Sequence, residues 1–235
     1  MIAAIHQHHY FPWMGYMDKM AKADAFLLLD QVQLTDASYM FRHQLLDKNG
    51  EKKYITIPFN KKGYMQRPYN ELELNASVDW QTRQRNFIWD NSRKHPYFSQ
   101  IWAEIEPVFT DRFDLLWQVT DASVQIMRRL LGVTTPLVYQ SSLRPAEGKK
   151  SEFLIDLLHQ LGAEAYLSGR GAMKYMDMDM FAAAGIRVEY QRFTLPVYPQ
   201  KNAADFVPGI SGLDVLFNCG IEETRRIFWD NVESN

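Results

Sequence analysis

The sequence predicts one α/β domain over residues 1–235, built on a mostly parallel, wound sheet, with a helical insertion or cap over residues 79–132. Two observations predict this fold class. Apolar strand patterns and helical patterns alternate in roughly the first thirty residues, and they alternate again in about the last hundred. Such alternation is typical of βαβ units, whose parallel strands are covered by helices. Helical patterns dominate the stretch between, which is why we assign it to an insertion.

The composition is that of a globular protein and excludes several other classes. Of 235 residues, 46% are hydrophobic, 23% charged and 14% aromatic, and the formal net charge is −2. These values exclude collagen-like, coiled-coil and disordered chains, and the missing basic excess argues against nucleic acid as a partner. The lone Cys219 excludes a disulfide framework. We find no signal peptide and no run of eighteen apolar residues, so we expect a cytoplasmic protein without a membrane span.

The opening of the chain predicts strand, turn, helix and strand. Residues 1–6 and 25–30 are apolar runs suited to buried strands, Pro12 breaks the first run, and methionines recur between the runs at helical spacing. This order is Rossmann-like. Ligands of parallel sheets bind beyond the carboxyl ends of the strands, where His6 and Asp30 both fall.

The remaining elements follow from periodicity and from turn residues. Asp79 is a predicted N-cap, and residues 195–210 are expected to form an ordered loop. Between residues 42 and 67, seven Lys or Arg stand against two acids, which we interpret as a surface loop that attracts an anionic small molecule. We expect helices over 80–94, 97–106, 114–131, 151–161 and 177–184, a last helical region from 213, and strands over 54–58, 137–140, 165–167 and 186–191.

The turn before the first helix carries the richest set of polar side chains. A strand-to-helix turn presents side chains and helix-start amides to a ligand and favours anions. Gly15 would let a backbone approach closely, and the ammonium of Lys19 would reach a phosphate from one turn inside the helix. The candidate residues are His6, Gln7, Tyr10, Trp13, Gly15, Tyr16 and Lys19, with Asp30 and Gln33 after the next strand.

Three interpretations of this turn stay open. His6 and His8 would form a strand-borne metal pair with Asp30, but no second histidine cluster supports it, and we expect no metal. The turn also resembles, in architecture, the H-x-G-H turn of nucleotidyl-transferring α/β enzymes, although Trp13 and Tyr16 stand where that motif has its histidines. The third interpretation is aromatic packing around the turn, with the histidines exposed.

A second candidate site follows the predicted strand over 165–167. Ser168, Gly169 and Arg170 form a turn whose small residues leave backbone amides free for an oxyanion. Arg170 supplies a planar, two-pronged donor for phosphate or carboxylate, and Tyr175 follows it. A plain loop with glycines for its turn geometry is the alternative.

A third candidate begins at Ser211, a predicted N-cap that places Asp214 at the capping-box position. Its functional alternative is that Asp214 orients a ligand hydroxyl or amine.

The chain resembles WbqC-like proteins, a bacterial family whose members often lie among genes for O-antigen and other surface polysaccharides. The likeness spans essentially the whole chain. One departure stands out: the family commonly has Pro-Asn after His-Gln, where this chain has His8-His9. The resemblance rests on His6-Gln7, Tyr10, Pro12-Trp13, Gly15-Tyr16, Lys19, Leu29-Asp30, Val32-Gln33, Ser141-Ser142, Tyr166 to Gly169, Gly171-Ala172, Tyr175, Tyr198-Pro199, Phe206, Pro208, Ser211, Asp214, Leu216 to Asn218 and Gly220.

Some members of this family are described as glycyl or aminoacyl transferases that decorate amino-sugars. The resemblance therefore implies an acyl or aminoacyl (glycyl-type) transferase or ligase that forms an amide on an amine, with a nucleotide-linked amino-sugar of O-antigen or lipopolysaccharide biosynthesis as an acceptor. Amide formation needs an activated acyl group, which would come from ATP as an acyl-adenylate or from a thioester on a carrier protein. Two alternatives are a non-catalytic protein that binds a nucleotide-sugar or a partner, and a metal-dependent hydrolase with histidine ligands.

Each candidate residue receives a role in this hypothesis. His6 and Lys19 would contact a phosphate or stabilise developing negative charge. Asp30 or Asp214 would hold the acceptor ammonium and help remove its proton. An anionic group would bind Ser168 and Arg170, and Trp13 or Tyr16 would line the pocket. We expect His6, Lys19 and Asp30 to converge on one solvent-reachable hollow at the rim of the sheet.

Overall fold

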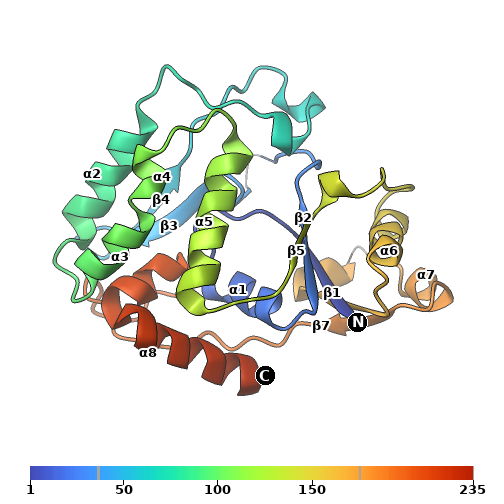
Figure 1. The fold of residues 1–235 in the computed structure, drawn as a ribbon. Coiled ribbons are helices and arrows are strands. Elements are labelled where there is room, and N and C mark those ends of the chain that lie inside the picture. The colour runs from blue at the N-terminus through green and yellow to red at the C-terminus, as the bar shows by residue number, and fades with distance from the viewer. Residues whose placement is uncertain (36–37, 175, 235) are drawn as a thin grey trace.

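The computed structural model describes residues 1–35, 38–174 and 176–234 of the protein (Figure 1). Over these residues it contains a five-stranded, fully parallel sheet of order β5-β2-β1-β6-β7. Within the same ranges, no helix has the length and apolar character that crossing a membrane requires. The strands are β1 (Ile2–Gln7), β2 (Ala25–Leu29), β5 (Leu137–Tyr139), β6 (Ala165–Ser168) and β7 (Arg187–Tyr190).

The order of the strands identifies where a ligand would bind. If the five strands of this sheet are numbered in chain order, they lie in the order 3-2-1-4-5, which is the Rossmann order without its sixth strand. The direction of winding reverses between β1 and β6, and the carboxyl edge at such a switch point is the usual ligand crevice of open α/β sheets. The predicted wound, mostly parallel fold class is confirmed.

Helices cover both faces of the sheet, as alternating side chains along each strand require. Ala4 of β1 packs with α1 (Met14–Ala21) and α5 (Leu116–Leu131), whereas Ile5 faces α6 (Ser151–Gln160) on the opposite side. Figure 1 shows α5 on one side of the strands and α6 and α7 on the other. The remaining helices here are α7 (Met178–Ala183) and α8 (Gly212–Ser234), the second of which runs along α1 and α5.

The segment between β2 and β5 begins with a β-hairpin and continues with helices. β3 (Arg42–Leu46) pairs antiparallel with β4 (Lys52–Thr56). The buried side chains of the hairpin and of the following helices share one hydrophobic cluster with the sheet. The other elements are η1 (Tyr64–Gln66), η2 (Tyr69–Glu71), α2 (Trp80–Ser92), α3 (Phe98–Ile105) and α4 (Pro107–Thr110).

Most predicted elements lie where the periodicity placed them. Asp79 caps α2 as predicted, since its carboxylate accepts a hydrogen bond from the Thr82 amide at 3.2 Å. Two predicted strands have shifted bounds: the strand over 54–58 is β4, and the strand over 137–140 ends at Tyr139 because η3 (Gln140–Ser142) begins there. The hairpin partner β3 was not predicted. Residues 191–211 contain no helix or strand, and η4 (Arg170–Lys174) follows β6.

Candidate functional site

The turn between β1 and α1 is held in a strained conformation by two serines. Phe11 has a positive φ of 38°, which a bulky residue rarely adopts. Its amide donates a hydrogen bond to Ser123 Oγ of α5 at 2.9 Å, and its carbonyl accepts one from Ser211 Oγ at 2.8 Å. The insertion and the start of α8 therefore fix the turn from both sides. His8 faces Asp121 of α5, whereas residues 9–13 line a cavity.

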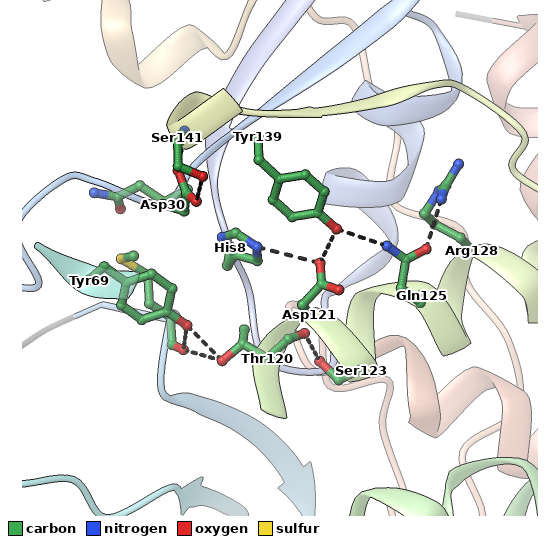
Figure 2. Close-up of polar contacts among 12 residues, drawn as sticks. His8, Asp30, Tyr69, Thr120, Asp121, Ser123, Gln125, Arg128, Tyr139 and Ser141 are labelled. Atoms are coloured by element: carbon green, nitrogen blue, oxygen red, sulfur yellow. Dashed lines mark hydrogen bonds and ion pairs between the residues drawn. The ribbon is translucent and has the colours of Figure 1, made fainter. Parts of the chain in front are cut away.

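His8 lies on one side of this turn, in a cluster of polar residues at the carboxyl edge of the sheet. Figure 2 shows His8 facing Asp121 of α5, with 3.6 Å between His8 Nε2 and Asp121 Oδ1. Tyr139, the last residue of β5, donates a hydrogen bond to the same oxygen at 2.7 Å. Gln125 donates to the Tyr139 hydroxyl at 3.2 Å. We refer to His8, Asp121, Gln125 and Tyr139 as the His8 cluster.

The imidazole of His8 is fully buried, yet neither ring nitrogen has a hydrogen-bond partner among the described residues. Buried polar groups in native proteins are nearly always paired, because an unpaired one costs about 1–3 kcal/mol. The Asp121 side chain is 18% exposed, so the cluster is reached from solvent on that side.

On the opposite side of the turn lies a cavity of about 260 Å³, which we call the aromatic pocket. Within the described residues, no Lys, Arg, Asp or Glu lines it. Its mouth carries two exposed rings, Trp13 (37% exposed) and Tyr39 (40%). The lining comes from residues 9–13, from Tyr39, His43 and Gln44 at the hairpin, and from residues 209–211.

Burial keeps three histidines at or beside the turn neutral: His6, His9 and His43. It lowers the pKa of His9 and of His43 to about 3. Burial is also the main cause that holds the pKa of His6 well below its usual value, with further contributions from Lys19 and His9. His9 stacks on the Tyr16 ring at 4.7 Å between centroids, and His6 packs edge-on against both rings.

The structure does not bring His6, Lys19 and Asp30 to one open hollow, so this expectation is wrong. Lys19 is 3% exposed and its ammonium donates to the Ile5 carbonyl at 2.9 Å, because the helix places it over the first strand. Burial lowers the pKa of Lys19 to about 7. The carboxylate of Asp30 instead accepts the amide of Ser141 at 2.9 Å and its hydroxyl, which anchors η3 to the end of β2 (Figure 2).

The aromatic residues of the turn divide between packing and pocket lining. The Tyr10 hydroxyl donates to Gln84 Oε1 at 2.7 Å and the Tyr16 hydroxyl to the Gln7 carbonyl at 3.1 Å, so neither hydroxyl is open to a substrate. Gly15 does not make room for a ligand backbone, as we had expected. A Cβ there would lie 2.3 Å from the Trp13 indole, so the glycine makes room for that ring.

The loop after β6 is only partly available to a ligand. The Ser168 side chain is fully buried and its hydroxyl donates to the Gly169 carbonyl at 3.3 Å, which corrects its predicted contact with an anion. Arg170 is exposed at the switch point, as the proposed anion contact requires. The exposed Gln33 lies in the loop after β2. The predicted role of Tyr175 lies outside the described residues.

Ser211 caps α8 as predicted, since its hydroxyl accepts the Leu213 amide at 3.2 Å. Asp214 does not complete a capping box. Its carboxylate accepts hydrogen bonds from Tyr198 at 3.0 Å and from Gln200 at 3.1 Å, so it anchors the loop before α8. Burial raises the pKa of Asp214 to about 6. The carboxylate is 4% exposed and its Oδ2 is engaged by these two partners, so the structure gives Asp214 a structural role at the start of α8.

Sequence reasoning missed Asp121, Tyr139 and His43. Asp121 occupies a partly exposed position of an amphipathic helix about 110 residues from His8, and Tyr139 ends a three-residue strand. The available signal was the pair His8-His9 itself, because its two rings must point to different sides of an extended segment. Among residues 1–35, 38–174 and 176–234, no group of three His, Cys, Asp or Glu is arranged to hold a metal ion. The described residues therefore offer no set of metal ligands for the alternative of a metal-dependent hydrolase.

These features define a Rossmann-type α/β protein with a buried histidine–aspartate pair at the carboxyl edge of its sheet and an aromatic pocket behind the same turn. The chain belongs to the WbqC-like protein family, whose match covers residues 7–226. It is 30% identical over 226 residues to "Uncharacterized protein Rv1507c" of Mycobacterium tuberculosis (strain ATCC 25618 / H37Rv), a match that covers 93% of this chain and 94% of that protein. No solved structure matches the chain.

Proposed function

We propose that this protein is a cytoplasmic acyl or aminoacyl transferase or ligase that joins a small carboxylic or amino acid to an amine, with His8 as the general base. The observation that carries the proposal is the His8 imidazole, which is buried and unpartnered among the described residues, 3.6 Å from Asp121. An imidazole beside a carboxylate is the usual pair for removing a proton from a nucleophile. Its location at the carboxyl edge of a parallel sheet agrees with where such sheets bind ligands.

The proposed reaction forms one bond and breaks one. The amine nitrogen attacks the acyl carbonyl carbon, and the bond from that carbon to the oxygen or sulfur of the donor breaks. The amine proton passes to a ring nitrogen of His8. Asp121 then stabilises the imidazolium, and the hydrogen bond from Tyr139 holds the carboxylate in place.

The class of donor follows from the requirement for an activated acyl group, and the acceptor is the one that the family resemblance implies. An acyl-adenylate formed from ATP, or a thioester on a carrier protein, supplies it, and a nucleotide-linked amino-sugar of surface polysaccharide biosynthesis supplies the amine. Arg170 binds the anionic part of the donor, because its guanidinium is exposed after β6 next to the switch point. The substrate reaches His8 past Asp121, a partly exposed member of the cluster.

The test is turnover with the two classes of donor. Purified protein is incubated with a small acid, ATP and an amino-sugar nucleotide, and pyrophosphate release and amide formation are followed by mass spectrometry. A parallel assay uses an acyl thioester. We expect His8→Gln to lower kcat by about 10²–10⁴-fold, the range for a lost general base, and Asp121→Asn to lower it by tenfold or more. The exposed His159 provides a matched control, and His159→Gln should retain full turnover.

Unchanged turnover in His8→Gln, with its fold intact by circular dichroism, would overturn the role of His8. Stabilisation by nucleotide-sugars without turnover of either donor class would instead support the non-catalytic binding alternative.

A further inference from the structure

The aromatic pocket contains a second buried histidine whose polar atoms are unpartnered. His43 of β3 is 2% exposed, and neither of its ring nitrogens has a hydrogen-bond partner among the described residues. Two aromatic rings pack against it: Tyr10 lies edge-on at 4.9 Å and Phe11 lies tilted at 5.3 Å between ring centroids. A buried imidazole that lines a cavity in this way lacks the partners that a ligand would provide.

The chemistry of the lining restricts what this ligand is. His43 is neutral, so it offers one N–H donor and one lone pair on the same ring. Since no Lys, Arg, Asp or Glu of the described residues lines the pocket, a fully charged group would be desolvated there without a counter-ion. The ligand group is therefore uncharged and has both an acceptor and a donor.

The aromatic rings add a shape requirement. Trp13 and Tyr39 are exposed at the mouth, where flat rings stack on a planar ligand. Gly15 and Phe193 fix the Trp13 indole, the first by leaving space for it and the second by an edge-on contact at 5.4 Å. The cavity of about 260 Å³ is smaller than the roughly 300–1,000 Å³ that encloses a whole drug-sized ligand, so it accepts one ring system.

We infer that the aromatic pocket binds an uncharged planar heterocycle, namely the base of a nucleotide, through stacking at its mouth and hydrogen bonds to His43. A nucleobase presents hydrogen-bond donors and acceptors along its edge and a π-face for stacking. The inference rests on the proposed function for the presence of a nucleotide substrate, but it concerns binding and needs no acyl transfer. The sugar and phosphates of that nucleotide lie outside the pocket mouth.

The experiment measures binding of unphosphorylated nucleosides, so that phosphate contacts cannot contribute. Uridine, cytidine, thymidine, adenosine and guanosine are titrated by calorimetry and by thermal shift, with tetramethylammonium and inorganic phosphate as further probes. We expect at least one nucleoside to bind, His43→Phe to weaken it about tenfold or more, and His43→Asn to retain part of the affinity because its amide keeps a donor and an acceptor.

Two matched controls separate the pocket from general damage. His95 is also buried and aromatic-packed but lies elsewhere, so His95→Phe should bind the nucleoside as the parent does. Trp89 matches Trp13 in exposure at 41%, so Trp13→Ala should weaken binding and Trp89→Ala should not.

Three results would overturn the inference: no nucleoside binds, His43→Phe and Trp13→Ala both bind as the parent does, or tetramethylammonium binds in place of nucleosides, which would identify a cation cage. None of these bears on acyl transfer to a simple amine, and failure of the transfer assay leaves nucleoside binding intact.

Discussion

The two sides of the turn that follows β1 surround a buried imidazole with different groups: His8 on one side and His43 on the other. At the carboxyl edge of the sheet, His8 faces a carboxylate that accepts a hydrogen bond from the Tyr139 hydroxyl, which in turn accepts one from Gln125. His43 faces aromatic rings and a cavity with no charged lining residue in the described chain. One side places a carboxylate beside a histidine, whereas on the other side burial lowers the pKa of the histidine and keeps it neutral.

Our two proposals follow this difference: they place chemistry on the His8 side and ligand recognition on the His43 side. A general base needs a partner for its charged form, whereas a recognition histidine works as a fixed donor and acceptor. The strained Phe11 follows His8 by three residues and lines the pocket, and its two serine contacts tie the turn to α5 and to the start of α8. The predictions below test this separation, beginning with the largest expected effect.

Lowering the pH should destabilise the protein, and His43 of the aromatic pocket should contribute to this loss. Burial lowers the pKa of His43 to about 3, while an unfolded histidine has a pKa of about 6.5. Between these values the unfolded chain binds a proton that the folded protein excludes, so stability is complete above about pH 6.5 and falls as the pH decreases. At about pH 4.5, His43 alone should cost about 2–3 kcal/mol of unfolding free energy.

Urea unfolding of the parent and of His43→Phe from about pH 8 to 4.5 measures this effect, with the difference at pH 8 as the packing baseline. Asp214 works in the opposite sense, because burial raises its pKa to about 6 and its contribution falls as the pH rises toward that value. It is common to both proteins and cancels. Parallel stability curves would show that His43 accepts a proton in the folded state.

Ser211→Ala should loosen the turn that separates the two sides. The substitution removes the hydrogen bond to the Phe11 carbonyl and the cap of α8, so the free energy of unfolding should decrease by about 2 kcal/mol. The same variant should weaken nucleoside binding. Ser234 at the other end of α8 is the control, and Ser234→Ala should change stability by less than about 0.5 kcal/mol. Equal losses of stability in Ser211→Ala and Ser234→Ala would show that the Ser211 hydrogen bonds do not stabilise the turn.

Tyr139→Phe should produce the smallest effect and only on the His8 side. It removes the hydrogen bond to Asp121, which should cost about 1 kcal/mol of stability and lower kcat while nucleoside affinity stays constant. Tyr190, whose hydroxyl donates to the Met178 sulfur at 3.4 Å, is the control for loss of a phenol hydroxyl. A changed nucleoside affinity in Tyr139→Phe would contradict the separation of the two sides.

The secondary structure was predictable wherever local pattern and burial agree. The buried runs of β1 and β2 and the capped helix α2 lie as the periodicity predicts. The hairpin strand β3 was missed because its alternation is short, although Asn49-Gly50 is a recognised turn signal and Gly50 adopts a φ of +81°. The turn signal for a hairpin was therefore present, but the basic residues around it favoured the prediction of a surface loop.

The candidate site was less predictable than the fold. The sequence pointed to the correct turn but ranked Lys19 and Asp30 as catalytic, and both are buried with structural partners. Nothing local to Asp121 or His43 marks either as a neighbour of the turn, because Asp121 reaches it from α5 and His43 reaches it from β3. Their contacts depend on how the segment between β2 and β5 packs against the sheet.

The sequence by itself determined the wound α/β architecture, the family and the turn that carries the polar residues, since periodicity, proline and glycine act over a few neighbouring positions. Only the tertiary structure decided which histidine meets a carboxylate and which lies among aromatic rings. Burial and charge pairing are properties of three-dimensional neighbours, and these neighbours come from segments more than thirty residues away from the turn.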